Sequence, residues 1–321
     1  MVRPLYRWFA ALATLCLFAA APVGAQNWPT RPVRIVVPFA VGGPADNFAR
    51  YLAQRLPEQL GQSFVVENRP GAGAVIGTDL VAKAPADGYT LLLMSNTHTV
   101  NETLVPNKPY NLMRDFVGVA PINYSDLVLV AHPSLPVANV QQLVRLAKER
   151  PGKLNYASSG TGTPYHMAGE LFKSMSGTFL VHIPYKGSSG ARTDLLGGQV
   201  DMMFDAVTTM SQMAKEGKVR ALATTGLTRS VPELPTVAES VPKYEATIWL
   251  GLMAPKNTPP EVVNKLNAAV RKITADPEVK AAWAKQGAVP MTMTVAQFHD
   301  HLNQDIAKWA EIVKVSGAKP E

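Results

Sequence analysis

The chain of 321 residues has a single cysteine, Cys16, which lies in an apolar N-terminal segment. Runs of lysine and arginine are also missing, because the formal charge of +7 comes from residues that are interspersed along the chain. Without a basic patch or a ladder of aromatic and basic residues, we do not expect the protein to bind nucleic acid. If the segment around Cys16 is removed, disulfides and thiolate chemistry are excluded as well.

The first 25 residues have the pattern of a secretory signal peptide. Arg3 and Arg7 precede an apolar run over residues 8–23, and small residues stand before Gln26, where a signal peptidase would cut. This run is shorter than the ~20 residues that a membrane span needs, although an uncleaved anchor is the alternative. We predict an exported protein that starts at Gln26, has no cysteine and carries a charge of +5, which is +7 less the two arginines.

Short apolar segments alternate with segments of helical period through most of the chain. The strand-like segments include "YTLLLMSN" (89–96) and "VDMMFDA" (200–206), and the helix-like ones include "YHMAGELFKSMSG" (165–177). This alternation predicts an α/β protein whose sheets are mostly parallel or mixed. The 296 residues left after cleavage (321 − 25) exceed one ordinary domain, so we expect two lobes. Residues 258–317 are predicted to be nearly all helical.

A faint internal repeat relates the two halves. Residues 64–80 resemble residues 179–195, and residues 43–49 resemble residues 163–169, where Pro follows a capping residue. Each half would place small-residue loops before helices, and helix N-termini carry unpaired N–H groups and a partial positive charge. Two facing lobes would thus surround one cleft with four loops that attract anions. The alternative is that any two βαβ units look alike at this level.

The stretch "YASSGTGTPYHMAGELF" (156–172) has the composition of a catalytic or phosphate-binding loop, but not its spacing. No Lys-Ser/Thr pair completes a phosphate loop, and Tyr165 stands where a dinucleotide fingerprint needs its third glycine. No G-x-S-x-G elbow occurs, and "SGAR" (189–192) puts Arg where a serine–lysine mechanism needs Lys. We therefore predict no enzyme; the minor alternative is an enzyme that uses Ser158 with His166, its only candidate reactive pair.

The histidines do not form a metal-binding pattern. Only His299 and His301 are close in sequence, and in a helix positions i and i+2 point to different faces. No H-E-x-x-H motif or Asp-rich calcium loop occurs. We expect neither a metal nor a cofactor.

Five segments, in this order, resemble the Bug family, the periplasmic solute receptors of tripartite tricarboxylate transporters. They are "VRIVVPFAVGGPADNFAR", "VVENRPGAGAVIGTDLVAKAPADGYTLL", "YASSGTGTPYHMAGELF", "HIPYKGSSGARTDLLGGQVDMMFD" and "VRALATTGLTRSVPELPTVAES". The resemblance implies a two-lobe periplasmic binding protein of type II-like fold, with two crossing segments as a hinge. Lobe one would comprise residues 26–125 and 246–321, and lobe two residues 126–245.

The resemblance also implies which residues bind the ligand, a small carboxylic acid, amino acid or aromatic acid. They follow strands or begin helices: Phe39, Ala40, Gly42, Gly43 and Asp46; Ser95, Asn96 and Thr97; Ser158, Ser159, Gly160, Thr161, Thr163 and His166; Lys186; and Asp205. Expected partners are permease subunits of a tripartite tricarboxylate transporter or, as the alternative, a sensor kinase. We expect a monomer.

Some of these assignments have competing interpretations. His166 is either a ligand contact or a helix-cap residue, Lys186 a ligand contact or a solvated lysine, and Asp205 a ligand contact or a cap or hinge residue. Phe39 and Trp249 are candidate walls of the pocket. The loop "VGGPADN" (41–47) is more apolar and stiffer than the family pattern, which favours a mono-carboxylate with an apolar or aromatic body.

Overall fold

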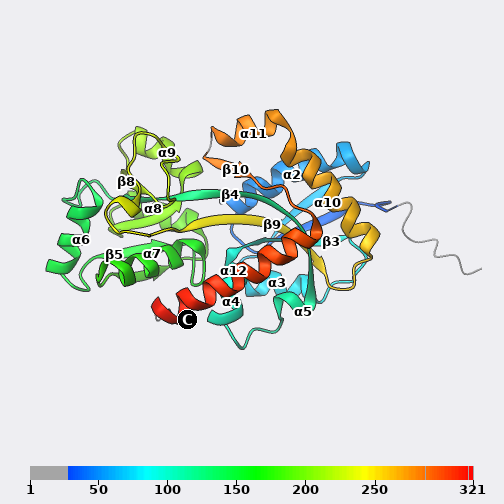
Figure 1. The fold of residues 1–321 in the computed structure, drawn as a ribbon, viewed down its shortest axis with the longest axis horizontal. Coiled ribbons are helices and arrows are strands. Elements are labelled where there is room, and N and C mark those ends of the chain that lie inside the picture. The colour runs from blue at the N-terminus through cyan, green and yellow to red at the C-terminus, as the bar shows by residue number, and fades with distance from the viewer. Residues whose placement is uncertain (1–27, 286, 317, 321) are drawn as a thin grey trace, which may run out of the picture.

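The structure, a computed structural model, describes residues 28–285, 287–316 and 318–320. The predicted signal peptide lies outside the described residues. Figure 1 shows an elongated molecule with one group of helices and strands at each end and two long strands, β4 and β9, running between them. No helix in the described ranges is both long and apolar enough to span a membrane.

The ten strands of the described chain end mostly in loops that precede a helix. They are β1 (Val33–Val37), β2 (Phe64–Asn68), β3 (Thr90–Ser95), β4 (Phe116–Ala131), β5 (Asn155–Ser158), β6 (Val181–Pro184), β7 (Met202–Ala206), β8 (Arg220–Thr224), β9 (Thr247–Pro255) and β10 (Ala288–Pro290). The α-helices are α2 (Pro44–Leu60), α3 (Val75–Ala82), α4 (Asn96–Leu104), α5 (Leu112–Asp115), α6 (Val140–Glu149), α7 (Pro164–Ser176), α8 (Ser188–Leu196), α9 (Val207–Lys215), α10 (Pro260–Ala275), α11 (Pro277–Ala284) and α12 (Val295–Ser316), with a short 3₁₀ helix at Val237–Glu239.

The strands form one mixed sheet with the order β2-β1-β3-β9-β4-β7-β5-β6, in which β8 and β10 also pair with β4. At one end β1 runs parallel to β2 and β3, and at the other β5 runs parallel to β6 and β7. β4 joins these two parts: its residues 116–126 pair with β9, whereas residues 127–131 pair with β7. We call the part with β1, β2 and β3 the first lobe, and the part with β5 to β8 the second lobe.

The internal repeat has a structural counterpart in the two lobes. The β2–α3 unit occupies the first copy of the repeat, and the β6–α8 unit occupies the second. α2 and α7 both begin with a proline, whose missing N–H would have no partner at that position anyway. Both helices end at a glycine in the left-handed conformation, Gly61 (φ 74°) and Gly177 (φ 64°), which a side chain would strain. Both copies of the predicted repeat therefore fall on corresponding strand–loop–helix units.

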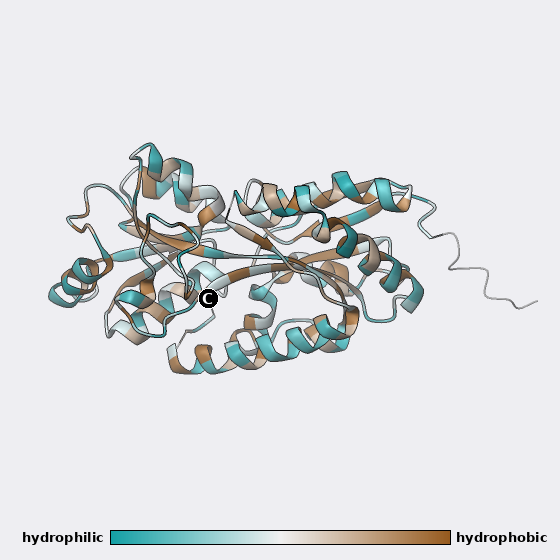
Figure 2. Cartoon of the chain, turned by 45° about the horizontal axis from the view of Figure 1, so that its top comes forward, coloured by the Kyte–Doolittle hydropathy of each residue, from teal (hydrophilic) through white to brown (hydrophobic). Residues whose placement is uncertain are grey.

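Each lobe has its own apolar core, and a smaller cluster connects the lobes. In this connecting cluster, Met167 of α7 packs with Val100 and Leu104 of α4 and with Trp309 and Val313 of α12. Figures 1 and 2 show α12 running along one side of the molecule from the first lobe to the second. The C-terminal helix thus bridges both lobes on the side where α7 lies.

The predicted α/β class with a mixed sheet agrees with the structure, but one strand and half of another were not predicted. The first half of β4 was not predicted, and β10 interrupts the C-terminal region that was expected to be nearly all helical. β10 has only three residues and pairs with β4, so nothing in its own pattern distinguishes it from a loop.

Candidate functional site

Two adjoining cavities lie between the lobes. The central cavity is lined by Phe39, Ala40, Gly43, Pro44, Ala45, Ser95, Ser159, Thr163, Pro164, Tyr165, Gly187, Ser188, Ile248 and Leu250. The outer cavity, of about 220 Å³, is lined by Pro38, Phe39, Pro70, Gly71, Ala72, Gly73, Ala74, Ser159, Gly160, Thr161, Thr163, Pro184, Tyr185 and Lys186. The central cavity has only about 30 Å³ free, room for roughly two water molecules. A ligand with several carbon atoms enters it only if the lobes separate or the walls move.

Four helices begin at the central cavity, two from each lobe. Its lining includes the first or capping residues of α2 (Pro44), α4 (Ser95), α7 (Pro164) and α8 (Ser188). Helix N-termini present unpaired N–H groups and a partial positive charge, so each favours an anion within its first turn. None of the described residues that line the central cavity carries a formal charge. Among the lining residues, the groups that favour an anion are therefore helix N-termini and hydroxyls rather than lysine or arginine.

The loops of the two lobes meet in a reciprocal arrangement. A Cβ added to Gly73 would lie 2.8 Å from the Thr161 carbonyl oxygen, and one added to Gly187 would lie 2.5 Å from the Ala40 Cβ. The second loop of each lobe therefore faces the first loop of the other lobe. Such an exchange of partners is the contact pattern of a two-fold axis, as the internal repeat implies. Glycine at these positions lets the backbones approach closely.

Nine of the sixteen predicted ligand residues line these cavities: Phe39, Ala40, Gly43, Ser95, Ser159, Gly160, Thr161, Thr163 and Lys186. Seven line neither cavity: Gly42, Asp46, Asn96, Thr97, Ser158, His166 and Asp205. The contacts of these seven show that several of them hold the loops from behind.

Asp46 is nearly inaccessible and holds the first loop. Its carboxylate accepts hydrogen bonds from the Gly42 N–H (3.0 Å), from Arg50 Nε (3.1 Å) and from Asn68 Nδ2 (3.0 Å). Burial alone would raise the pKa of Asp46, but these hydrogen bonds outweigh it and lower the pKa below its usual value. The Asp46 carboxylate is thus hydrogen-bonded entirely by groups of the first lobe.

Asp205 is fully buried and paired with Arg192 of α8. Arg192 donates from Nε to Asp205 Oδ2 (2.5 Å) and from Nη2 to Oδ1 (3.1 Å), which is a two-pronged contact. Nη2 of Arg192 also donates to Ser188 Oγ (3.0 Å), and Ser188 lines the central cavity. Asp205, predicted as a ligand contact or as a cap or hinge residue, is thus paired with an arginine of its own lobe.

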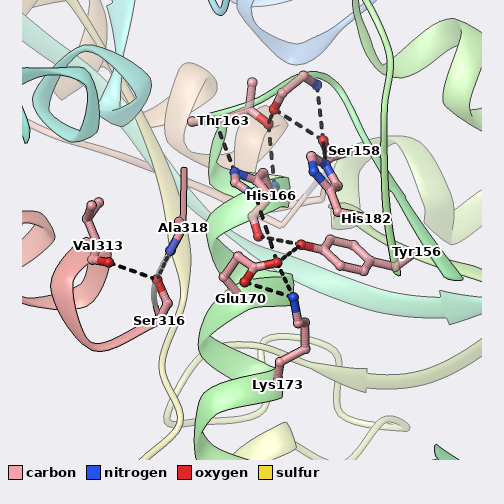
Figure 3. Close-up of polar contacts among 12 residues, drawn as sticks. Tyr156, Ser158, Thr163, His166, Glu170, Lys173, His182, Val313, Ser316 and Ala318 are labelled. Carbon is pink, nitrogen blue, oxygen red and sulfur yellow. Dashed lines mark hydrogen bonds and ion pairs between the residues drawn. The ribbon is translucent and has the colours of Figure 1, made fainter. Parts of the chain in front are cut away.

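Ser158 and His166 lie behind the second-lobe loop (Figure 3). Ser158 is fully buried, and its hydroxyl contacts His182 Nε2 at 2.6 Å. His166 Nδ1 accepts a hydrogen bond from the Gly162 N–H (3.1 Å). The enzyme alternative requires a hydrogen bond between Ser158 and His166. In the structure Ser158 instead contacts His182, and His166 instead contacts Gly162.

The end of β3 forms a capped helix start. Ser95 Oγ accepts from the Thr97 N–H (3.2 Å), and the Ser95 N–H donates to His98 Nδ1 (3.1 Å). Asn96 donates from Nδ2 to the Thr247 carbonyl (2.9 Å) at the start of β9. Of the three predicted residues here, Ser95 alone lines the central cavity, while Asn96 ties α4 to a strand that runs between the lobes.

The sequence interpretation missed several lining residues. The loop of residues 70–74 faces the outer cavity, and the repeat could have located it because it matches the loop before α8. Ile248 and Leu250 wall the central cavity, whereas Trp249 packs against Phe298 on the other face of β9. Alternate side chains of a strand point to opposite faces, so the candidate wall Trp249 lies away from the cavity. The other candidate wall, Phe39, lines both cavities.

A larger cavity of about 810 Å³ lies between α9, β8 and residues 230–234 of the second lobe and Ala284, Lys285 and Gly287 around the end of α11. It contains none of the predicted site residues, and its walls are mostly aliphatic. Among the described residues, no group of three or more His, Cys, Asp or Glu is arranged to hold a metal ion.

Comparisons with known proteins agree with this architecture. A family model described as "Tripartite tricarboxylate transporter family receptor" matches residues 48–318. Protein BugT of Bordetella pertussis is 40% identical over 305 residues, which cover 94% of each chain. The structure of "R. palustris Rpa4515 with adipate" superimposes with a TM-score of 0.88 at 37% identity, over 92% of this chain and 100% of that one. MatC from Rhodopseudomonas palustris with bound malate gives 0.84 at 30% identity, over 89% and 100%. The predicted two-lobe fold and the resemblance to the Bug family are confirmed.

Proposed function

Since this chain belongs to the tripartite tricarboxylate transporter receptor family, we propose that it binds a small carboxylate in the central cavity and closes its lobes around it. The receptors of this family are periplasmic, and the predicted signal peptide would export this chain. Binding, rather than turnover, is the reaction that the site supports, because Ser158 is buried behind the loop and bonded within its own lobe.

The convergence of four helix N-termini on one cavity without charged lining residues carries this proposal. A carboxylate there would accept hydrogen bonds from main-chain N–H groups and hydroxyls, and charge-assisted bonds of this kind are strong. Two of these helices belong to each lobe. The full set of donors therefore surrounds the ligand only in the closed form, which excludes water and strengthens the same bonds.

We propose that the nine lining residues named above contact the ligand or wall its site, and that Asp46, Ser158, His166 and Asp205 support them from behind. The lobe boundaries at 125/126 and 245/246 are part of this proposal. The first lies one residue before the point, between residues 126 and 127, where the partner of β4 changes from β9 to β7, and the second lies just before β9 begins at Thr247. Lys186 stands at the outer cavity, where a second carboxylate or a polar tail of the ligand would meet a cation.

The walls of the central cavity favour a ligand with an apolar body, since Phe39, Ile248 and Leu250 surround it. Adipate and malate, bound by the two relatives, are dicarboxylates. The loop composition favours a mono-carboxylate instead, so hexanoate and adipate form a matched pair of probes with the same number of carbon atoms. The closed form would then be presented to a permease or, as the second candidate, to a sensor kinase.

The test is a thermal-shift screen of hexanoate, adipate, malate, benzoate and aspartate at pH 7.5, followed by calorimetry of the carboxylates that stabilise the protein. Ser159→Ala removes a hydroxyl at both cavities, and we expect it to weaken binding about tenfold. Ser189→Ala is the matched control, because Ser189 is exposed and lines neither cavity. If no carboxylate stabilises the wild type, or if the ligand is recovered chemically altered after denaturation, the proposal is wrong.

A further inference from the structure

Three rings are stacked directly beneath the second-lobe ligand loop (Figure 3). His182 of β6 lies between Tyr156 of β5 and His166 of α7. The ring centroids are 5.0 Å apart for Tyr156 and His182 and 4.0 Å apart for His166 and His182, with interplanar angles of 27° and 21°. Two histidine rings packed face to face at this distance would repel each other strongly if both were charged.

Both histidines reach the loop through hydrogen bonds. His182 Nε2 contacts Ser158 Oγ at 2.6 Å, and the same oxygen accepts from the Gly160 N–H at 3.1 Å. His166 Nδ1 accepts from the Gly162 N–H at 3.1 Å. Two N–H groups of the glycine-rich loop are therefore directed into the second lobe and away from the central cavity. Their direction determines which way the intervening peptide groups can face.

We propose that His182 is a positioning residue for the ligand loop, acting through Ser158; this inference rests on the proposed function of that loop. His182 lies on β6, the last strand in the sheet order, 24 positions from Ser158. It holds the Ser158 hydroxyl, which in turn holds Gly160. Ser159, between these two residues, lines both cavities. A displaced Ser158 would therefore move a lining residue.

The surroundings of the stack keep both rings neutral. The Tyr156 hydroxyl donates to Glu170 Oε1 (2.6 Å), and Lys173 Nζ lies 2.7 Å from the same oxygen. The Glu170 charge is thus shared by two donors, and His166 Nε2 is 3.8 Å away from it. Burial lowers the pKa of His166 to about 4 and that of His182 to about 3. A neutral His166 retains Nδ1 as the acceptor that the Gly162 N–H needs.

Two substitutions of His182 can distinguish its hydrogen bond to Ser158 from its packing in the ring stack. His182→Phe keeps a flat ring in the stack but cannot contact Ser158 by a hydrogen bond. His182→Gln loses the ring but places an amide nitrogen at a similar reach. If the hydrogen bond matters, Gln rescues ligand affinity better than Phe does. If only the ring matters, the order is reversed.

The experiment measures the affinity for the carboxylate that most stabilises the wild type, with adipate as the first probe, by calorimetry at pH 7.5. We expect His182→Phe to weaken binding about tenfold and His182→Gln to restore most of the loss. We also expect Ser158→Ala to weaken binding by a similar factor, and the double variant His182→Phe/Ser158→Ala to be no weaker than either single variant. His299→Gln, an exposed histidine of α12, is the control and should bind as the wild type does.

Three outcomes overturn the inference. The first is a double variant whose loss of affinity is the product of the two single losses, the second is a His182→Phe variant that binds as tightly as the wild type, and the third is a His182→Phe variant that binds more tightly than His182→Gln. Thermal unfolding of each variant at pH 7.5 identifies any that fail to fold, and His182→Gln then supplies the comparison with Ser158→Ala. A wild type that binds no carboxylate would instead refute the proposed function, so the two failures are distinguishable.

Discussion

Gly73 offers the sharpest test of closure, because its contact crosses from one lobe to the other. A Cβ at this position would lie 2.8 Å from the Thr161 carbonyl oxygen, about 0.6 Å short of an ordinary 3.4 Å contact (3.4 − 2.8). Both atoms belong to backbone or to Cβ, so neither can swing aside. We expect Gly73→Ala to stop closure about 0.6 Å early near the loop.

The consequence for binding follows from hydrogen-bond geometry. A donor that would lie about 2.9 Å from the ligand carboxylate would stand at about 3.5 Å (2.9 + 0.6), where the bond is largely lost. Losing one hydrogen bond to a charged group costs about 1.5–3 kcal/mol, which corresponds to roughly a 10- to 100-fold weaker Kd. The free energy of unfolding should fall by about 1–2 kcal/mol from the left-handed backbone at Gly73 (φ 57°), but the contact itself should add little, because it is absent when the lobes are open.

Two neighbouring glycines provide matched controls. Gly42 also has a positive φ (81°), but a Cβ there meets nothing within 4 Å, so Gly42→Ala carries the backbone strain without the contact. A Cβ added to Gly43 would lie 3.5 Å from Ser188 Oγ of the other lobe, an ordinary contact, and the φ of Gly43 is not in the left-handed region. Gly43→Ala thus adds a Cβ between the lobes without strain. Kd is measured by calorimetry and stability by urea unfolding. The reasoning fails if Gly73→Ala binds as tightly as Gly42→Ala.

Three further predictions address the connecting cluster, the buried ion pair and the histidines. Met167→Ala should lower the free energy of unfolding by about 2–5 kcal/mol and should also weaken carboxylate binding. Met94→Ala, in the first-lobe core, should lower only the free energy of unfolding. Equal carboxylate affinities of the two variants would contradict this prediction. Arg192→Met should destabilise the second lobe by about 3–5 kcal/mol, because it leaves the buried Asp205 unpaired. Urea unfolding of the double variant Arg192→Met/Asp205→Leu should then show a smaller loss of stability, since no unpaired charge remains. Between pH 6.5 and pH 5, histidines of the unfolded chain become protonated, whereas buried histidines of the folded chain stay neutral. The free energy of unfolding should therefore fall by up to about 1.4 kcal/mol per pH unit for each buried histidine. The histidines are those whose pKa burial lowers to about 4 or about 3: His98, His166 and His182. A urea midpoint that stays constant over this range would refute the pH prediction.

The loops of the site could be predicted from the sequence because their signals are local. A proline that begins a helix after a glycine or threonine marks the starts of α2 and α7, and both starts lie at the central cavity. The repeat at an offset of 115 correctly indicated a second loop in each lobe. In the first lobe this second loop is residues 70–74, although none of its residues was among the predicted ligand residues.

The roles of individual side chains could not be predicted, because they depend on partners distant in sequence or on the phase of a strand. Ser158 looked like a ligand contact, but its partner His182 comes from the next strand of the sheet. Asp205 is bonded to Arg192, an ion pair that composition does not reveal. Trp249 is the largest side chain near the crossing on β9, yet it faces away while its smaller neighbours line the cavity.

In the proposed site, the two-fold character of the contacts would explain how the central cavity can lack charged walls and still bind an anion. α2 and α4 approach it from the first lobe, and α7 and α8 approach it from the second. When the lobes separate, a carboxylate held by either lobe keeps only half of these helix ends and regains contact with water, which weakens each remaining bond. When they meet, the same glycines that permit close approach bring all four ends together. Binding and closure are then one thermodynamic event, and a substitution that blocks the meeting of the loops must reduce affinity even if it touches no ligand atom.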